Sequence, residues 1–290
     1  MQGISTRHVH LPRDEDDAEL LCSEVGAGPE AVILLHGLTG HRHDFQSVLP
    51  QLARGSPMRW LAPDLRGHGD FTHTGRSETF TFDQLVEDLV RLLEALGIER
   101  AHLLGHSFGG MVSLRFALSR PHQLRSLILM STTPNAPEGY DEALFENAGA
   151  IARERGMGFL QQIVEKVSRR EENPTPADRQ TAKWADVYWP HQVLRYRAMD
   201  PVGYAALGHA MVQQRDLSED LSRIQCPTTV LVGADDTRFL SGAETLAQGI
   251  TNARKHVIPD AGHHPQMENT DAWLEAMRGH LQAIQEAPVR

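Results

Sequence analysis

The chain has 290 residues, a formal net charge of −10 and 40% apolar residues. Its length suffices for one large domain or for a core with an insertion, and its acidic balance argues against a surface that binds nucleic acid or an anionic membrane. The longest clean apolar run, residues 31–35, is far shorter than the roughly 20 residues that a transmembrane helix needs.

The first residues and the cysteines predict the compartment. Residues 1–7 lack the apolar core of a signal peptide, so we expect a cytoplasmic protein. Cys22 and Cys226 are too few for a disulfide framework and suit a reducing compartment. We expect each of them to be a small buried apolar residue.

Apolar runs of strand length recur along the chain, and segments with helical periodicity lie between most of them. The runs cover residues 18–25, 31–36, 58–63, 101–106, 124–130, 228–233 and 254–259. Strands that alternate with helices are typical of a mostly parallel sheet covered on both faces. The sequence therefore predicts the α/β class.

Two helices are clear from their apolar stripes. The first covers residues 82–96, where Thr81 begins a capping box and Gly97 suits the position after the last turn. The second covers residues 270–284, with Thr270 as its N-cap. We expect both stripes to serve the core only.

Residues 134–216 interrupt the alternation of strands and helices. This stretch contains no convincing strand and holds helical patterns after a proline-rich start. We therefore expect a core formed by residues 1–133 and 217–290, with residues 134–216 as a helical insertion between two core strands.

The most informative motif is Gly105-His106-Ser107-Phe108-Gly109. It follows an apolar strand-like stretch and opens a helix-like one, which is the context of a nucleophile elbow. A serine on so tight a turn is forced toward unusual backbone angles, and the flanking glycines let strand and helix pass without a clash. The motif predicts Ser107 as a nucleophile.

A serine nucleophile needs a base and a carboxylate that orients it. The predicted strand 228–233 is followed by Asp235 and Asp236, and the next strand by His263 and His264. Serine, aspartate and histidine thus occur at the carboxyl ends of predicted strands, where open parallel sheets place their sites.

The oxyanion of acyl transfer needs backbone donors. The strand 31–35 runs into His36-Gly37-Leu38-Thr39-Gly40, where glycine allows the backbone to turn an amide toward the site. We expect the backbone N–H groups of Leu38 and Phe108 to form the oxyanion hole.

These motifs, together with Asp64-Leu65-Arg66-Gly67-His68-Gly69, resemble the α/β-hydrolase family over nearly the whole chain. The closest branch contains esterases, lactonases, C–C bond hydrolases and cofactor-free haloperoxidases that carry a cap. The resemblance implies a mostly parallel sheet of eight strands with flanking helices. It also implies that residues 134–216 form a helical cap after the sixth strand, and that no metal or organic cofactor is needed.

The resemblance also selects between neighbouring candidates. The family's acid usually lies three residues after the strand-ending glycine, which favours Asp236 over Asp235, expected to be solvated or to cap a turn. The family's base follows glycine directly, which favours His263 over His264, expected to face away or to line the rim. One departure is the longer loop at residues 70–76, so the rim of the site there cannot be copied from relatives.

Other residues receive weaker predictions. His36 and Gly37 lie near the substrate, but the histidines His36 and His106 are expected mainly to pack and to satisfy hydrogen bonds. Asp64 and Arg66 are expected to be structural. The aromatic residues are expected either to cover the acyl pocket or to bury the insertion; they are Trp184, Tyr188 and Trp189. Arg195 and Arg197 are expected either to meet an anionic substrate or, as the simpler alternative, to lie in solvent.

The resulting functional prediction is a serine hydrolase for a small, partly apolar carboxylic ester or lactone, acting through an acyl-enzyme. The same triad also serves C–C bond hydrolases of vinylogous diketones, and a hydrolase-like small-molecule receptor is a third alternative. We expect no nucleic-acid or membrane partner and no metal site, since the histidine pairs lack ligand spacing. The sequence leaves a monomer and a small homo-oligomer both open.

Overall fold

A computed structural model describes residues 3–11, 18–71, 73–168 and 174–286 of the chain. Its sheet contains β1 (Ser5–Leu11), β2 (Ala18–Val25), β3 (Glu30–Leu35), β4 (Met58–Pro63), β5 (Ala101–His106), β6 (Leu124–Met130), β7 (Thr228–Gly233) and β8 (Arg254–Ile258). The strands are ordered β1-β2-β4-β3-β5-β6-β7-β8. The pairs β1–β2 and β2–β4 are antiparallel and the others are parallel, which confirms the predicted sheet.

The α-helices are α1 (Leu49–Ala53), α2 (Phe82–Ala95), α3 (Phe108–Ser119), α4 (Glu142–Arg155), α5 (Met157–Ser168), α6 (Pro176–Lys183), α7 (Ala185–Arg197), α8 (Pro201–Val212), α9 (Leu240–Gly249), α10 (Pro265–Glu268) and α11 (Thr270–Glu286). Short 3-10 helices are η1 (Arg42–Phe45), η2 (Ser77–Thr79), η3 (Pro121–Gln123) and η4 (Ser218–Arg223). None of the helices described is long and apolar enough to cross a membrane.

The sheet separates two hydrophobic cores. On β3, Ile33 and Leu35 face the core built by α2, α3 and α9, whereas Val32 and Leu34 face the core built by α1 and α11. Successive side chains of a strand point to opposite faces, so a strand covered on both sides is apolar throughout. This is why the strand signals appeared as continuous apolar runs.

Three expectations need correction at the level of elements. Strand β1 was missed, because it lies at the edge of the sheet and only Val9 and Leu11 are buried in it. Asn269, not Thr270, caps α11, since its carbonyl accepts from the Trp273 N–H and its side chain from the Ala272 N–H. Cys22 is buried as expected, but Cys226 is only partly so.

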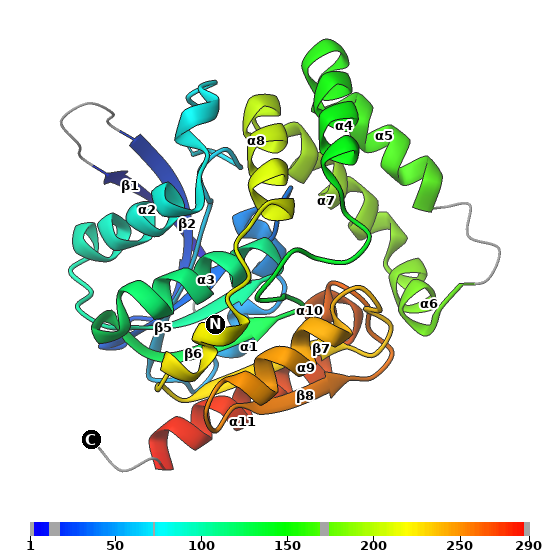
Figure 1. Cartoon of the computed structure of the whole chain (residues 1–290). Helices are drawn as coiled ribbons and strands as arrows, with labels where there is room; N and C mark the ends of the chain where they lie inside the picture. Colours follow the sequence, from blue (N-terminus) through cyan, green and yellow to red (C-terminus); the bar gives the residue numbers. More distant parts are fainter. Residues whose placement is uncertain (1–2, 12–17, 72, 169–173, 287–290) are drawn as a thin grey trace.

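Between β6 and β7 the described chain is helical, from α4 to α8. Figure 1 shows α4, α5, α6 and α7 grouped together at one end of the molecule, beyond the carboxyl ends of the parallel strands. Helices α4 and α8 pack on each other, with the Phe145 ring so close to Gly208 that a side chain there would clash. We call α4–α8 the inserted helices.

Candidate active site at the carboxyl ends of the parallel strands

Ser107 lies on the turn between β5 and α3, in a conformation that side chains rarely adopt. Its φ and ψ are 53° and −117°, and its N–H donates to the Met130 carbonyl of the neighbouring strand at 2.8 Å. A non-glycine residue at positive φ is strained, and such strain concentrates at functional sites. The turn has the backbone geometry that the elbow motif predicted.

The glycines around Ser107 are required by close approach. A Cβ on Gly105 would lie 2.3 Å from the Ser113 Oγ, and one on Gly109 would lie 2.4 Å from the His36 carbonyl oxygen. Real side chains cannot occupy that space, so strand and helix pass as closely as they do only because both residues are glycine. This confirms the reason given for the two glycines.

The Ser107 hydroxyl is not engaged. The residue is 7% exposed, and its Oγ makes no hydrogen bond within the described part of the chain, to His263 or to any other residue. The Oγ is nevertheless not fully buried, so it retains contact with accessible space. A hydroxyl in this state is available to a ligand.

The loop after β3 lies against Ser107. A Cβ on Gly37 would lie 3.1 Å from the Ser107 Cβ. Within this loop the Thr39 N–H donates to His68 Nε2 at 3.2 Å and the Gly40 N–H to the Gly37 carbonyl at 2.9 Å. By contrast, the Leu38 and Phe108 N–H groups have no hydrogen-bond partner among the residues described.

Asp236 and His263 meet as the sequence predicted. The His263 Nδ1 donates to Asp236 Oδ2 at 3.0 Å, and the His263 ring stacks on Phe239 with centroids 4.7 Å apart. Burial opposes ionisation of Asp236, but the charge and hydrogen bond of His263 outweigh it and lower the pKa of the carboxyl. Asp236 is therefore a carboxylate that fixes the imidazole.

His106 connects the turn that carries Ser107 to the loop that carries His263. Its Nε2 donates to the His263 carbonyl at 2.7 Å, and the two rings lie with centroids 4.9 Å apart. Burial, followed by the charge of His263, lowers the pKa of His106 to about 3. His106 is thus a neutral tether, in line with the packing role expected of it.

His36 is also structural. Its Nδ1 donates to the Gly37 carbonyl at 2.9 Å, and its Nε2 accepts from the Leu65 N–H at 3.0 Å. Burial holds the pKa of His36 well below its usual value. Both ring nitrogens are occupied, so His36 shapes the loop and leaves no nitrogen for a substrate.

Asp64 and Arg66 are structural as well. Asp64 pairs with Arg42 at 2.5 Å, and Arg66 pairs with Asp88 at 2.6 Å. The carboxylates of Asp64 and Asp70 and the His41 ring come close enough to hold a cation, but the Arg42 guanidinium already contacts both carboxylates. A fixed positive charge occupies the place that a metal ion would need.

The two rejected neighbours behave differently from each other. Asp235 accepts from the Ala177 N–H at 2.9 Å and so caps the first turn of α6, which fits the expected capping role. His264 was expected to face away or to line the rim. It is half-buried, and its Nε2 accepts from Arg195 Nη1 at 3.1 Å.

Sequence reasoning missed Glu268, which fastens the loop that carries His263. Its Oε2 accepts from the N–H groups of Gly262 at 2.7 Å and His264 at 3.1 Å, the two amides that flank His263. Burial raises the pKa of Glu268 to about 7, against the effect of these two donors. The only signal was a carboxylate shortly after the predicted base, which single-sequence reasoning cannot separate from a surface acid.

Trp184 and Arg195 in the inserted helices do not match their expectations. Trp184 is 61% exposed and so neither covers a pocket nor buries the insertion. Tyr188 and Trp189 are half-buried, with their rings edge to face at 5.1 Å. Arg195 is 3% exposed, so the expectation of a solvated arginine is wrong for it, although it holds for Arg197.

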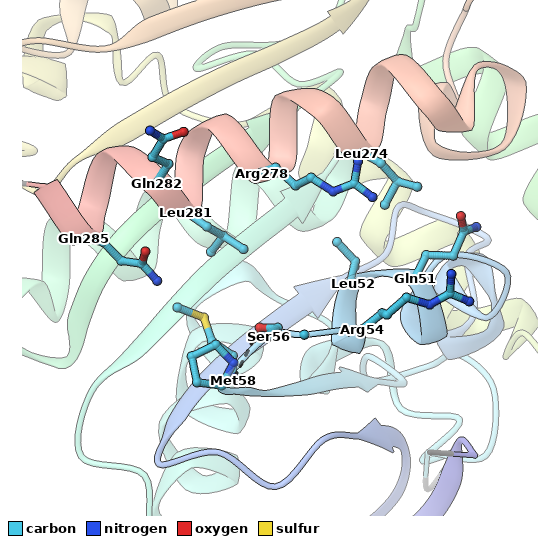
Figure 2. A pocket seen from close by; sticks show the side chains of 12 residues that line it. Gln51, Leu52, Arg54, Ser56, Met58, Leu274, Arg278, Leu281, Gln282 and Gln285 are labelled. Carbon is cyan, nitrogen blue, oxygen red and sulfur yellow. Dashed lines mark hydrogen bonds between the residues drawn. The ribbon is translucent and has the colours of Figure 1, made fainter. Parts of the chain in front are cut away.

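A surface groove lies far from these residues. Figure 2 shows it between α11 and the segment from α1 to the start of β4. Its volume is about 260 Å³. Leu52, Met58, Leu274 and Leu281 provide its apolar lining. It opens at the amino end of β4, whereas Ser107, Asp236 and His263 follow the carboxyl ends of their strands and do not line it.

Comparisons with known proteins agree with the fold. The model of the alpha/beta hydrolase fold family matches residues 30–270. A proline iminopeptidase of Lactobacillus crispatus is 27% identical over 269 residues, which cover 86% of this chain and 89% of that protein.

Solved structures are similar over almost the full length. A hydrolase from Pseudomonas aeruginosa has 28% identity and a TM-score of 0.79, covering 95% of this chain and 98% of that one. A thermophilic esterase from Thermogutta terrifontis has 26% identity and a TM-score of 0.82, covering 97% and 99%. Since the family match spans well over half of the sequence, this chain belongs to the α/β-hydrolase fold family, as its motifs predicted.

Proposed function

We propose that this protein is a serine hydrolase that cleaves a small, partly apolar carboxylic ester or lactone through an acyl-enzyme. The observation that carries the proposal is the hydrogen bond of 3.0 Å between His263 and Asp236, next to the strained turn that presents Ser107. The similarity to an esterase over 97% of the chain supports an acyl substrate.

In the proposed reaction His263 Nε2 takes the proton of Ser107 as the Oγ attacks the acyl carbon. Asp236 keeps the Nδ1 protonated, so that Nε2 is the basic nitrogen, and then stabilises the imidazolium. The unengaged N–H groups of Leu38 and Phe108 stabilise the oxyanion. His263 returns the proton to the leaving alcohol, and a water activated by the same base releases the acid. The missing Ser107–His263 hydrogen bond is compatible with this, since catalytic hydrogen bonds tighten when substrate binds.

The first test is Ser107→Ala. We expect kcat toward a p-nitrophenyl ester to fall by roughly 10⁴-fold or more, because the triad acts as a unit. The melting temperature should stay close to that of the parent. Ser119→Ala, an exposed serine at the end of the same helix, is the matched control and should keep full activity. Near-normal turnover by Ser107→Ala would refute the proposal.

The second test identifies the bond. Short p-nitrophenyl esters, simple lactones and a vinylogous diketone are assayed side by side at equal concentration. We expect esters or lactones to be turned over fastest. A diketone rate far above the ester rate would instead assign a C–C bond hydrolase with the same triad. Covalent labelling by a fluorophosphonate without turnover of any of these substrates would favour a receptor-like protein.

A further inference from the structure

Arg195 is a buried arginine that the inserted helices place among the loops of the candidate active site. It lies near the end of α7 and is 3% exposed, whereas Arg197 on the same helix is exposed. A buried guanidinium is costly unless it is paired and hydrogen-bonded. Its partners therefore indicate why it is there.

The hydrogen bonds of Arg195 reach both sides of the serine. The Nε donates to the Thr39 carbonyl at 3.0 Å, within the loop that presents the Leu38 N–H. The Nη1 donates to His264 Nε2 at 3.1 Å, directly after the base His263, and to Gln192 Oε1 at 3.2 Å. The planar guanidinium of Arg195 thus joins two loops: the loop after β3, which we call the oxyanion loop, and the loop after β8 that carries His263 and His264, which we call the His263 loop.

Other contacts also position these two loops, but each leaves one group for Arg195 to fix. The N–H of Thr39 is fixed by His68, so the contact with Arg195 fixes its other side, the carbonyl. The His264 ring lies 5.1 Å from the His106 ring and 5.4 Å from the His263 ring, centroid to centroid. Arg195 supplies the hydrogen bond that orients this ring.

The charge of Arg195 is balanced from the core. Asp44 is buried, and its Oδ1 lies 3.4 Å from Arg195 Nε and accepts from His191 Nε2 at 2.8 Å. Burial opposes ionisation of Asp44, but the charge of Arg195 and the hydrogen bond of His191 hold its pKa far below the usual range. The ion pair links α7 to η1, the short helix that carries Asp44.

We propose that Arg195 is a positioning residue for acyl transfer, through which docking of α7 holds the oxyanion loop and the His263 loop in register. This inference rests on the proposed function. Because Nε and Nη1 donate to internal acceptors, Arg195 acts through Thr39 and His264. Displacement of catalytic groups by about 1 Å can cost about 10²-fold in rate. Removal of the fork should therefore slow the chemical step more than it weakens binding.

The test measures the rate of Ser107 labelling by a fluorophosphonate together with kcat and KM for a p-nitrophenyl ester. For Arg195→Gln we expect the labelling rate and kcat to fall by about 10- to 100-fold, with KM changed less than about threefold. Arg197→Gln, the neighbouring arginine on the same helix, is the matched control and should change neither.

Two further variants keep the test valid if Arg195→Gln folds poorly. The double variant Arg195→Gln/Asp44→Asn removes both buried charges, so its melting temperature should recover while the labelling rate stays low. Arg195→Lys keeps a charge beside Asp44 but lacks the rigid fork, so its rate should lie between those of the parent and Arg195→Gln.

The outcomes separate the two proposals. A double variant that regains both stability and rate would show that Arg195 only stabilises the fold, and would overturn its positioning role. Equal labelling rates in the parent and in Arg195→Gln would overturn it as well. If the parent neither labels at Ser107 nor turns over any ester, the proposed function itself fails, and the role of Arg195 fails with it.

Discussion

The loops around Ser107 and the inserted helices differ in how tightly they are specified. The loops after β3, β5, β7 and β8 are fixed by backbone hydrogen bonds, by the buried His36 and His106 and by the half-buried Glu268. In the inserted helices large apolar side chains remain at the surface. In the described chain, nearly all large apolar side chains that are more than a third exposed belong to the inserted helices or lie directly beside them: Leu144, Ile163, Val164, Val167, Trp184, Val187 and Leu194. The exception is Val257.

The difference shows where substitutions should matter. Under the proposed function the loops hold the reacting groups, whose position determines the rate, so nearly every buried contact in them should affect activity. The inserted helices contact the loops of the site at a few points, such as the hydrogen bonds of Arg195 and the Asp235–Ala177 hydrogen bond. Most of their surface should tolerate change.

Among the substitutions that compare the two regions, the largest effect is expected for Asp236→Asn. The amide of asparagine donates a hydrogen bond where the carboxylate accepted one, so it favours the wrong imidazole tautomer. We expect kcat to fall by roughly 10³- to 10⁴-fold with the fold retained, measured by ester turnover and circular dichroism. Asp235→Asn, the adjacent acid, should retain at least about half of the activity. Equal losses in the two variants would mean that the carboxylate has been misassigned.

Gly109→Ala tests the packing of the serine turn. The new methyl group would lie 2.4 Å from the His36 carbonyl oxygen, and backbone cannot move aside cheaply. We expect the free energy of unfolding in urea to fall by roughly 1–3 kcal/mol. Gly279→Ala on α11, where a Cβ meets nothing within 4 Å, should instead stabilise the protein by about 0.5–1 kcal/mol. A tolerated Gly109→Ala would show that the close approach is not required.

These two substitutions also mark what could be predicted from the sequence. Ser107, Asp236 and His263 each follow an apolar strand, and the sheet brings the ends of parallel strands together, so local patterns sufficed to predict that these three residues lie at the same end of the sheet. Glycine spacing carried the same information. Arg195, Asp44 and Glu268 could not be found, because their roles depend on partners far away in the sequence or on burial, which no local pattern encodes.

Strand β1 was missed, and the expectation for Trp184 was wrong, for related reasons. Strand β1 lies at the edge of the sheet and contains only two apolar residues, Val9 and Leu11, so it gave no continuous apolar run. Trp184 looked like a pocket residue because of its type, but its position at the junction of α6 and α7 leaves it exposed. Residue type predicts burial poorly where a helix lies at the surface.

Glu268→Gln should change stability in a pH-dependent way. Its pKa of about 7 in the folded protein exceeds its ordinary value of 4.5. Below pH 4.5 the carboxyl is protonated in both states. As the pH rises toward 7 the unfolded chain ionises first, so stability is lost over this window. Glutamine keeps an acceptor for the Gly262 and His264 amides and cannot ionise. We therefore expect its melting temperature to exceed that of the parent by a few degrees at pH 8 and by little at pH 4.5. The same difference at both pH values would contradict a raised pKa.

The smallest effect is expected for Trp184→Ala in the inserted helices. Since this side chain is largely in solvent, the free energy of unfolding should change by less than about 0.5 kcal/mol, and kcat/KM by less than about twofold. Tyr188 lies in the same helical segment but is half-buried, so Tyr188→Ala should lower the free energy of unfolding in urea by more than Trp184→Ala does. A tenfold loss of kcat/KM for Trp184→Ala would erase the contrast between the two regions.

The most direct test of the account is to trap the nucleophile. The intact protein is incubated with a fluorophosphonate, and the adduct is located by peptide mass spectrometry in the parent and in His263→Ala. We expect a single adduct on Ser107 in the parent, and labelling slowed by roughly 10³-fold or more without the base. An adduct on another residue, no adduct at all, or equally fast labelling of Ser107 in His263→Ala would contradict a serine activated by this histidine.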